Sequence, residues 1–265
     1  MRNLKFFWLI FILTYTMSYC QSKQVNAFDV RQFESTPAFE VAKAVQDEDT
    51  IKVSQAIRKN PELLSFQEKR FGHSLLSFAV ITGKLQAVKN LLRLGADANQ
   101  KADSSNLSPF LYACRFASSI AHGNEILQHL IRHGADLNSS FVDSSLDQFG
   151  RKKMFKSSPL ELVCRYGNLQ AVRLLINSGA DPFRYPSNGE KSLVNASLPN
   201  LDILKYLLME VQLPIPNYCV IRNKGLKKEA KLTITDILNE KTFEGKEYKK
   251  DREEILRFLK QKRKR

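Results

Sequence analysis

The chain has 265 residues, of which 43% are hydrophobic and 26% are charged, a composition that permits a packed core and excludes disorder of the whole chain. The 41 lysines and arginines exceed the 27 aspartates and glutamates, so the formal net charge is +14. Four cysteines are too few for a disulfide scaffold, and no apolar run reaches the about 18 residues that a membrane-spanning helix needs.

Residues 1–20 have the pattern of a secretory signal peptide. Arg2 and Lys5 form a short basic region, and a continuous apolar run follows them. Cys20 stands where a bacterial lipoprotein signal ends, and the segment resembles such a signal, although Tyr19 replaces the small residue that usually precedes the cysteine. The resemblance implies a lipid on Cys20 and, in a bacterium, a place in the periplasm or at the outer membrane. Plain secretion and an uncleaved anchor remain as alternatives.

Residues 21–37 are mostly polar, and we expect them to form a tether between this signal and the folded domain.

The body of the chain contains an internal repeat. Residues 83–97 align without a gap with residues 167–181, and residues 123–136 are a third copy that is one residue shorter. All three copies end in the sequence Gly-Ala-Asp. Such self-similarity is the signature of a repeat architecture.

Apolar residues recur within each copy at the spacing of one helix face. Leu85, Val88 and Leu91 form this face in the first copy, and Leu169 and Val172 begin it in the second. A glycine in the left-handed conformation is expected to close each helix. The closing glycines are Gly95, Gly134 and Gly179.

A shorter helix is predicted before each copy. The Ser-Pro pairs at 108–109 and 158–159 are start signals, because serine caps a helix and proline suits its first turn. Neither helix of a pair can bury its apolar face alone, so neighbouring pairs are expected to stack and share one core. These first helices are expected over 74–82, 108–116 and 158–166.

This helix pair resembles the ankyrin repeat. The family's Thr-Pro-Leu-His-x-Ala box is similar to residues 74–79, 108–113 and 158–163, and its Gly-Ala-Asp-x-Asn ending is similar to residues 95–99 and 134–138. The family's threonine and histidine are replaced in all three boxes. The resemblance implies an all-α solenoid of five to six repeats with hairpin-like loops, and a function in protein binding without catalysis.

The repeat domain is predicted to fill residues 38–262, with a basic tail at 263–265. Degenerate repeats are expected to flank the three clear copies, the first of them acting as the N-terminal cap. The predicted repeats are 38–71, 72–107, 108–156, 157–190, 191–222 and 223–262.

Some segments depart from the regular repeat. Residues 117–122 form an insertion between the two helices of one pair, and the connection 139–156 is longer than the short hairpin of the family. A loop of that length is functional or disordered. Pro214 and Pro216 exclude a helix from the irregular segment 210–230.

The residues that carry chemistry do not form a recognisable active site. His129 and His133 have a spacing that suits a metal, but no third ligand is evident. Cys114 and Cys164 occupy equivalent repeat positions and are interpreted as buried core residues. Cys219 has no base beside it in the sequence. We therefore predict no enzyme activity, no metal and no cofactor.

The family resemblance implies that a protein partner binds along the first helices and the hairpin tips. Aromatic and arginine side chains dominate such interfaces. Tyr112 and Phe116 have an alternative role in packing between repeats. The candidate partner-binding residues are Phe78, Tyr112, Arg115, Phe116, Arg165, Tyr166, Phe183, Arg184 and Tyr185.

The C-terminal segment 222–265 carries 16 lysines and arginines against 8 aspartates and glutamates. Such a segment suits an anionic membrane surface or an acidic protein, whereas the signal peptide argues against nucleic acid. The sequence therefore indicates an exported protein-binding module. It is an envelope scaffold or an immunity-type protein that neutralises a toxin, and an enzyme that uses Cys219 or the long loop is the rival hypothesis.

Overall fold

The structure is a computed structural model that describes residues 25–102, 107–139, 141–146, 152–185, 192–221, 230–239 and 246–262. The predicted signal peptide, Cys20 and the basic tail 263–265 lie outside these ranges. Within them, no helix is both long and apolar enough to cross a membrane.

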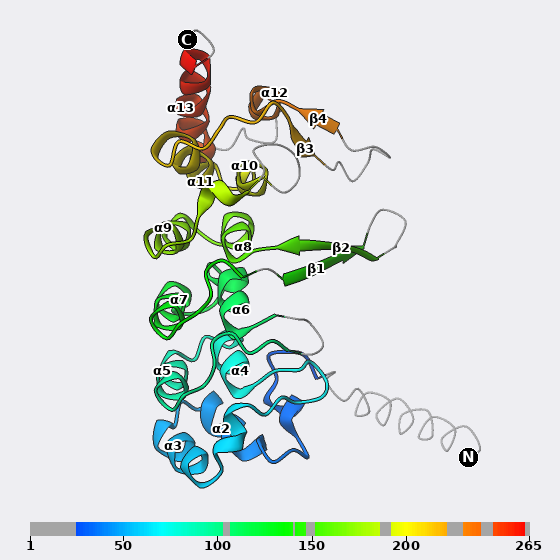
Figure 1. Cartoon of the computed structure of the whole chain (residues 1–265), viewed down its shortest axis with the longest axis vertical. Helices are drawn as coiled ribbons and strands as arrows, with labels where there is room; N and C mark the ends of the chain where they lie inside the picture. Colours follow the sequence, from blue (N-terminus) through cyan, green and yellow to red (C-terminus); the bar gives the residue numbers. More distant parts are fainter. Residues whose placement is uncertain are drawn as a thin grey trace, which may run out of the picture.

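Helices follow one another in pairs and build a single column (Figure 1). The second helices α3, α5, α7 and α9 line the left side of the column in Figure 1, and the first helices α4, α6 and α8 lie to their right. The pairs are α2 (Phe39–Gln46) and α3 (Thr50–Lys59), α4 (Leu75–Ile81) and α5 (Leu85–Arg93), α6 (Pro109–Phe116) and α7 (Gly123–Arg132), α8 (Pro159–Tyr166) and α9 (Leu169–Asn177), α10 (Leu193–Ser197) and α11 (Leu201–Lys205), and α12 (Ile234–Asn239) and α13 (Lys246–Lys262).

The predicted helix starts are confirmed at the serine caps. The hydroxyl oxygen of Ser74 accepts a hydrogen bond from the Ser77 amide at 3.2 Å, and that of Ser158 accepts one from the Glu161 amide at 3.2 Å. Ser108 caps α6 in the same way. Each cap satisfies an amide that the first helical turn leaves unpaired.

The predicted helix ends are confirmed at the glycines. Gly95 has a φ of 98° and Gly179 has a φ of 103°, which a residue with a side chain rarely adopts. This turn lets the Ala96 amide reach back to the Leu91 carbonyl at 3.0 Å. The same bond recurs from Ala180 to Leu175, so each second helix ends in one geometry that redirects the chain to the next pair.

One hydrophobic core runs through the whole column. Leu91, Leu130 and Leu175 occupy equivalent positions on α5, α7 and α9, and all three are fully buried. The first helices pack in order, α6 against both α4 and α8, and α8 against α10. Cys114 and Cys164 are fully buried on α6 and α8, as predicted.

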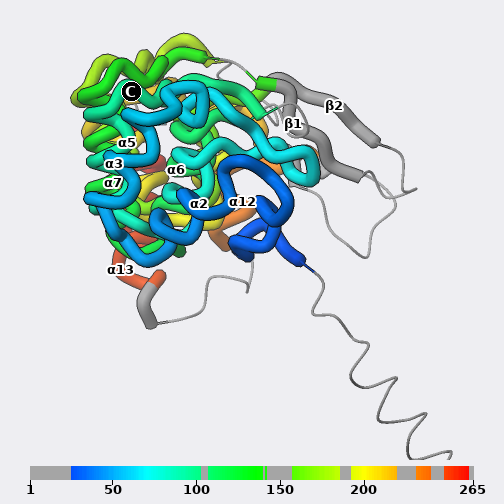
Figure 2. The backbone as a smooth tube through the Cα atoms, turned by 90° about the horizontal axis from the view of Figure 1, so that it is seen from below, coloured from blue at the N-terminus to red at the C-terminus, as the bar shows by residue number. Residues whose placement is uncertain are grey.

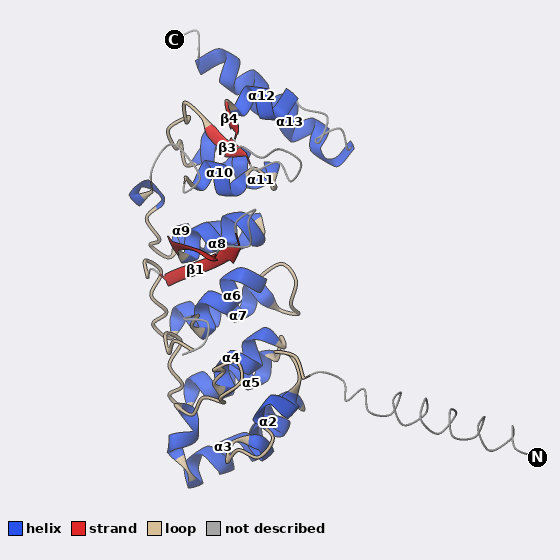
Figure 3. Cartoon of the chain, turned by 90° about the vertical axis from the view of Figure 1, so that its right-hand side faces the viewer, coloured by secondary structure: helices blue, strands red, loops and turns tan. Residues whose placement is uncertain are grey.

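The all-α expectation is incomplete, because two hairpins interrupt the helices (Figure 3). Strand β1 (Phe141–Leu146) pairs antiparallel with β2 (Lys152–Ser157) inside the connection 139–156, with Phe141 opposite Ser157. Strand β3 (Cys219–Ile221) pairs with β4 (Ala230–Leu232). A connection that leaves the stack needs partners for its backbone amides and carbonyls, and antiparallel pairing supplies them. Buried Phe141 fixes the base of the longer hairpin.

The predicted tether 21–37 is wrong for the part that the structure describes. A short 3-10 helix, Val30–Phe33, packs against α2, and the Phe33 side chain is fully buried. Its ring meets the Phe78 ring edge to face, with the ring centres 5.4 Å apart. Figure 2 shows this segment as the dark blue loop beside α2. Two phenylalanines in a polar stretch supply enough apolar surface to dock it.

Candidate functional site

The inner side of the column is the side that the first helices form and from which the β1–β2 hairpin projects (Figure 1). Arg115 and Phe116 lie at the end of α6, and Arg165 and Tyr166 lie at the equivalent end of α8. We name these four residues the arginine–aromatic ridge.

The ridge residues contact one another across two repeats. The Arg115 guanidinium carbon lies 5.6 Å from the centre of the Tyr166 ring, within the range of a cation–π interaction. The Ser118 hydroxyl, from the predicted insertion 117–122, donates a hydrogen bond to the Tyr166 carbonyl at 2.6 Å. Tyr166 nevertheless keeps 42% of its surface exposed. The insertion therefore holds the backbone of Tyr166, whose ring stays partly exposed.

Arg165 is held from beneath by a buried acid. Its Nη2 atom donates to the Glu161 carboxylate at 2.8 Å, and the Ser157 hydroxyl donates to the same carboxylate at 2.9 Å. Glu161 is only 5% exposed and stands where the ankyrin box has its histidine. A buried carboxylate needs such partners, so the ion pair orients Arg165 toward the ridge.

Two of the predicted partner-binding residues are not available on the surface. Phe78 is fully buried, because α2, α6 and the docked Phe33 cover it, and it is removed from the candidate surface. Tyr112 is only 8% exposed and packs parallel to Phe116, so its alternative role in packing fits the structure better. Phe78 lies outside the apolar face of its own helix, but the docked N-terminal segment covers it.

Between the N-terminal segment and α4 and α6 lies an open cavity of about 270 Å³. The Phe28 ring forms one wall, and its centre lies 6.2 Å from that of Phe116 in an edge-to-face contact. The sequence did not predict this cavity, because Phe28 lies in the predicted tether 21–37. The other lining residues are Ala27, Arg70, Phe71, His73, Ile81 and Tyr112.

We name this space the aromatic cavity. A run of hydrogen bonds through His73 lies at its wall. His73 Nδ1 lies 2.8 Å from the Gln32 side-chain oxygen, and His73 Nε2 lies 3.1 Å from the Tyr112 hydroxyl. The amide oxygen can only accept, so Nδ1 carries the proton and the tyrosine donates to Nε2. Burial lowers the pKa of His73, and the nearby Glu68 carboxylate opposes the effect. A neutral histidine thus links the N-terminal segment to α6.

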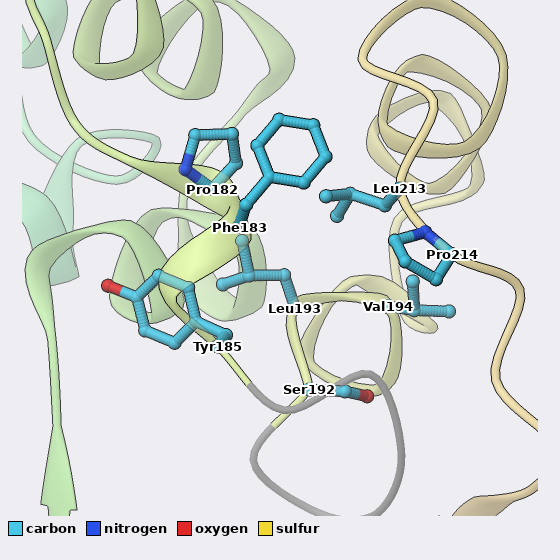
Figure 4. A pocket seen from close by; sticks show the side chains of 8 residues that line it. All are labelled: Pro182, Phe183, Tyr185, Ser192, Leu193, Val194, Leu213 and Pro214. Atoms are coloured by element: carbon cyan, nitrogen blue, oxygen red, sulfur yellow. The ribbon is translucent and has the colours of Figure 1, made fainter.

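A second exposed aromatic site lies one repeat further along, at the turn Pro182–Arg184 (Figure 4). The Phe183 side chain is 61% exposed and turns toward Leu213 across a small cavity of about 50 Å³. Tyr185 turns the other way, and its hydroxyl donates to the Ser158 hydroxyl at 2.6 Å. Arg184 is exposed and donates to the Asn138 carbonyl at 3.3 Å. Phe183 and Arg184 are therefore accessible, whereas Tyr185 mainly braces α8.

Cys219 and His133, which the sequence offered for catalysis or metal binding, have structural environments. Burial raises the pKa of Cys219 to about 11, so its thiol is protonated at neutral pH. His133 Nδ1 lies 2.8 Å from the carbonyl of His129 on the same helix end. Among the described residues, no three histidine, cysteine, aspartate or glutamate side chains are grouped so that they could hold a metal.

Comparison with known proteins supports the repeat assignment. Residues 156–185, which contain α8 and α9, match the ankyrin-repeat family model. The chain is also 25% identical over 196 residues to the Target of rapamycin complex 2 subunit AVO2 of Saccharomyces cerevisiae. That similarity covers 71% of this chain and 41% of the yeast protein, so the chain spans less than half the length of this relative.

The match confirms the ankyrin-repeat resemblance on the repeat that carries Arg165 and Tyr166. Ankyrin repeats are protein-interaction units, generally without catalytic activity, and the yeast relative is named as a subunit of a complex. The stacked helix pairs and the match together identify an ankyrin-type repeat in this chain.

Acid should weaken the folded state through His73. The pKa of His73 is lowered by folding, so below about pH 6.5 the unfolded chain gains a proton more readily than the folded protein. The free energy of unfolding should therefore fall as the pH falls below that value. Urea unfolding of the His73→Gln variant should show a shallower decline, since glutamine cannot take up the proton.

A second variant for this experiment is His129→Gln, because burial and nearby cations also lower the pKa of His129, on the other side of the column. The two variants should each remove part of the pH dependence. A His73→Gln variant with the full slope of the wild type would contradict the assignment.

Proposed function

We propose that this chain is a non-enzymatic binding module that holds a protein partner on the arginine–aromatic ridge. The observation that carries the proposal is the Arg115–Tyr166 contact, which keeps a guanidinium and a half-exposed ring side by side on the inner side of two adjacent repeats. Arginine and tyrosine are enriched among residues that dominate binding energy, because they bury much area and lose little conformational freedom. Phe183 and Arg184 are further exposed candidates at the turn next to the N-terminal end of α8.

The charge of the chain favours an acidic partner. The formal net charge is +14, and the ridge carries two guanidinium groups, of which only that of Arg165 pairs with the buried Glu161 carboxylate. Complementary charge speeds the encounter of two proteins and excludes partners of the wrong sign.

We further propose that the module is exported and held at a membrane through a lipid on Cys20. The support is the signal-like segment 1–20 and the cysteine at its end. Cys20 precedes the docked segment by few residues, and a chain of five residues spans at most about 18 Å. An anchor there would hold the inner side of the first repeats close to the bilayer. Exposed Lys249, Lys250 and Arg257 on α13 supply a second cationic surface that suits anionic lipid headgroups.

Removing the ridge should abolish partner capture and leave the column folded. In Arg115→Ala/Tyr166→Ala, affinity for the partner should fall roughly thirtyfold, about 2 kcal/mol, since hot-spot side chains are lost. The measurement is affinity capture from native membranes with quantitative mass spectrometry, followed by titration of the captured protein.

The matched control is Arg173→Ala, which removes an arginine that stacks on Tyr206 at 4.2 Å and pairs with Glu210. This arginine has the same chemistry as Arg115, but it belongs to a second helix. The control should retain capture. Equal capture by the ridge variant and the wild type, with both folded, would remove the ridge from the interface.

Lipid attachment is tested on Cys20 itself. Cells that express the full chain and are fed labelled palmitate should incorporate the label into the wild type, and Cys20→Ser should lose both the label and sedimentation with membranes. Cys219→Ser is the control, because Cys219 is buried and should not accept a lipid. Label that persists in Cys20→Ser would exclude this residue as the anchor point.

A further inference from the structure

The aromatic cavity beside Phe28 has the size and walls of a receptor for one aromatic ring. An apolar cavity of about 150 Å³ in another protein binds benzene. The present cavity is about 270 Å³ and is open on one side, so a ring can enter without displacing the fold. Phe28, Phe71 and Phe116 offer ring edges and faces to an incoming aromatic group.

The chain itself shows which side chains this surface accepts. Its N-terminal segment docks on the inner side by two rings, Phe33 against Phe78 and Phe28 against Phe116. Phe33 is fully buried, whereas Phe28 is 53% exposed and leaves the adjoining space unfilled. An aromatic residue from another polypeptide would repeat the contact that Phe28 makes.

The charge at the cavity is positive. Arg70 lines the cavity, is exposed, and makes no ion pair with any carboxylate in the part of the chain that the structure describes. The nearest acid in sequence, Glu68, is 1% exposed and is held by the backbone amides of Arg70, Phe71 and His73 at 2.6 to 2.9 Å. Among the described residues, no carboxylate side chain lines the cavity. An anionic group on the ligand would therefore meet an unopposed guanidinium.

We propose that the aromatic cavity receives one aromatic side chain of the protein partner, in a segment where a carboxylate residue flanks that ring. This proposal rests on the proposed protein-binding function and specifies which residues of the partner are recognised. Phe116 belongs both to the cavity wall and to the arginine–aromatic ridge, so a bound segment would continue from the cavity onto Arg115 and Tyr166.

The probe is the blocked tripeptide Glu-Phe-Glu, titrated into the full chain while the Ile81 methyl resonances are followed by NMR. Ile81 lines the cavity and is 2% exposed, so it reports a ring inside. The tripeptide should shift these resonances saturably, with a dissociation constant on the order of 1 mM. Glu-Ala-Glu, which lacks the ring, should not shift them, and Lys-Phe-Lys should bind more weakly.

Two variants locate the binding without disturbing the core. Ala27→Phe places a ring in the cavity from its half-buried edge and should weaken binding about tenfold. Arg70→Gln removes the exposed cation and should weaken binding about threefold, as expected for an exposed ion pair. Ile51→Ala, which removes an exposed apolar side chain from the second helix α3, is the control and should bind as the wild type does.

The results that would overturn the proposal are distinct from those that would overturn the ridge. Absence of saturable shifts in the wild type, or undiminished binding in Ala27→Phe, excludes an aromatic receptor. Tighter binding of free phenylacetate than of the tripeptide would identify a small aromatic acid as the occupant instead. Arg115→Ala/Tyr166→Ala should keep tripeptide binding even though partner capture is lost. Full partner capture by Ala27→Phe would show that the partner does not use the cavity.

Discussion

The whole molecule depends on apolar faces that no single helix pair can bury. Leu91, Leu130 and Leu175 are each fully buried because the next pair covers them, and a pair removed from the column would expose its half of the contact. The glycine turns make this sharing possible, since Gly95 and Gly179 send each pair back in the same direction. Because every repeat is placed by its neighbours, the ends of α6 and α8 form one rigid surface.

Segments at the two ends of the column pack against its terminal repeats. Near the N-terminus, Phe33 and Gln32 cover the inner side of α4, with His73 as the polar link. At the other end, Lys205 on α11 pairs with Asp251 and Glu254 on α13 at 2.6 and 2.7 Å and holds the last helix against the stack. Between these two ends, Tyr166 on the inner side of the middle repeats stays 42% exposed. The docked segment that stabilises the first repeats therefore also borders the proposed partner-binding surface and forms a wall of the aromatic cavity.

Much of the fold could be predicted from local signals, because caps and turns act within a few residues. The serines at 74, 108 and 158 start helices, and the closing glycines end them. The candidate site was less predictable. Phe78 lies outside the core pattern of its own helix, and only the docking of a distant segment buries it. The β1–β2 hairpin was also missed, because strand pairing in a long connection is decided by backbone partners rather than by helical periodicity. The two phenylalanines in the otherwise polar segment 21–37, Phe28 and Phe33, are the sequence feature that could have predicted its docking.

Hydrogen exchange in a Leu160→Ala variant tests the shared core most directly. Leu160 is fully buried on α8, and α8 packs against both α6 and α10. If neighbouring pairs support one another, the cavity left by the missing side chain should speed amide exchange in α6 and α10 as well as in α8, with α2 affected least. Faster exchange confined to α8 and α9, with α6 and α10 unchanged, would contradict a column held together by shared apolar faces.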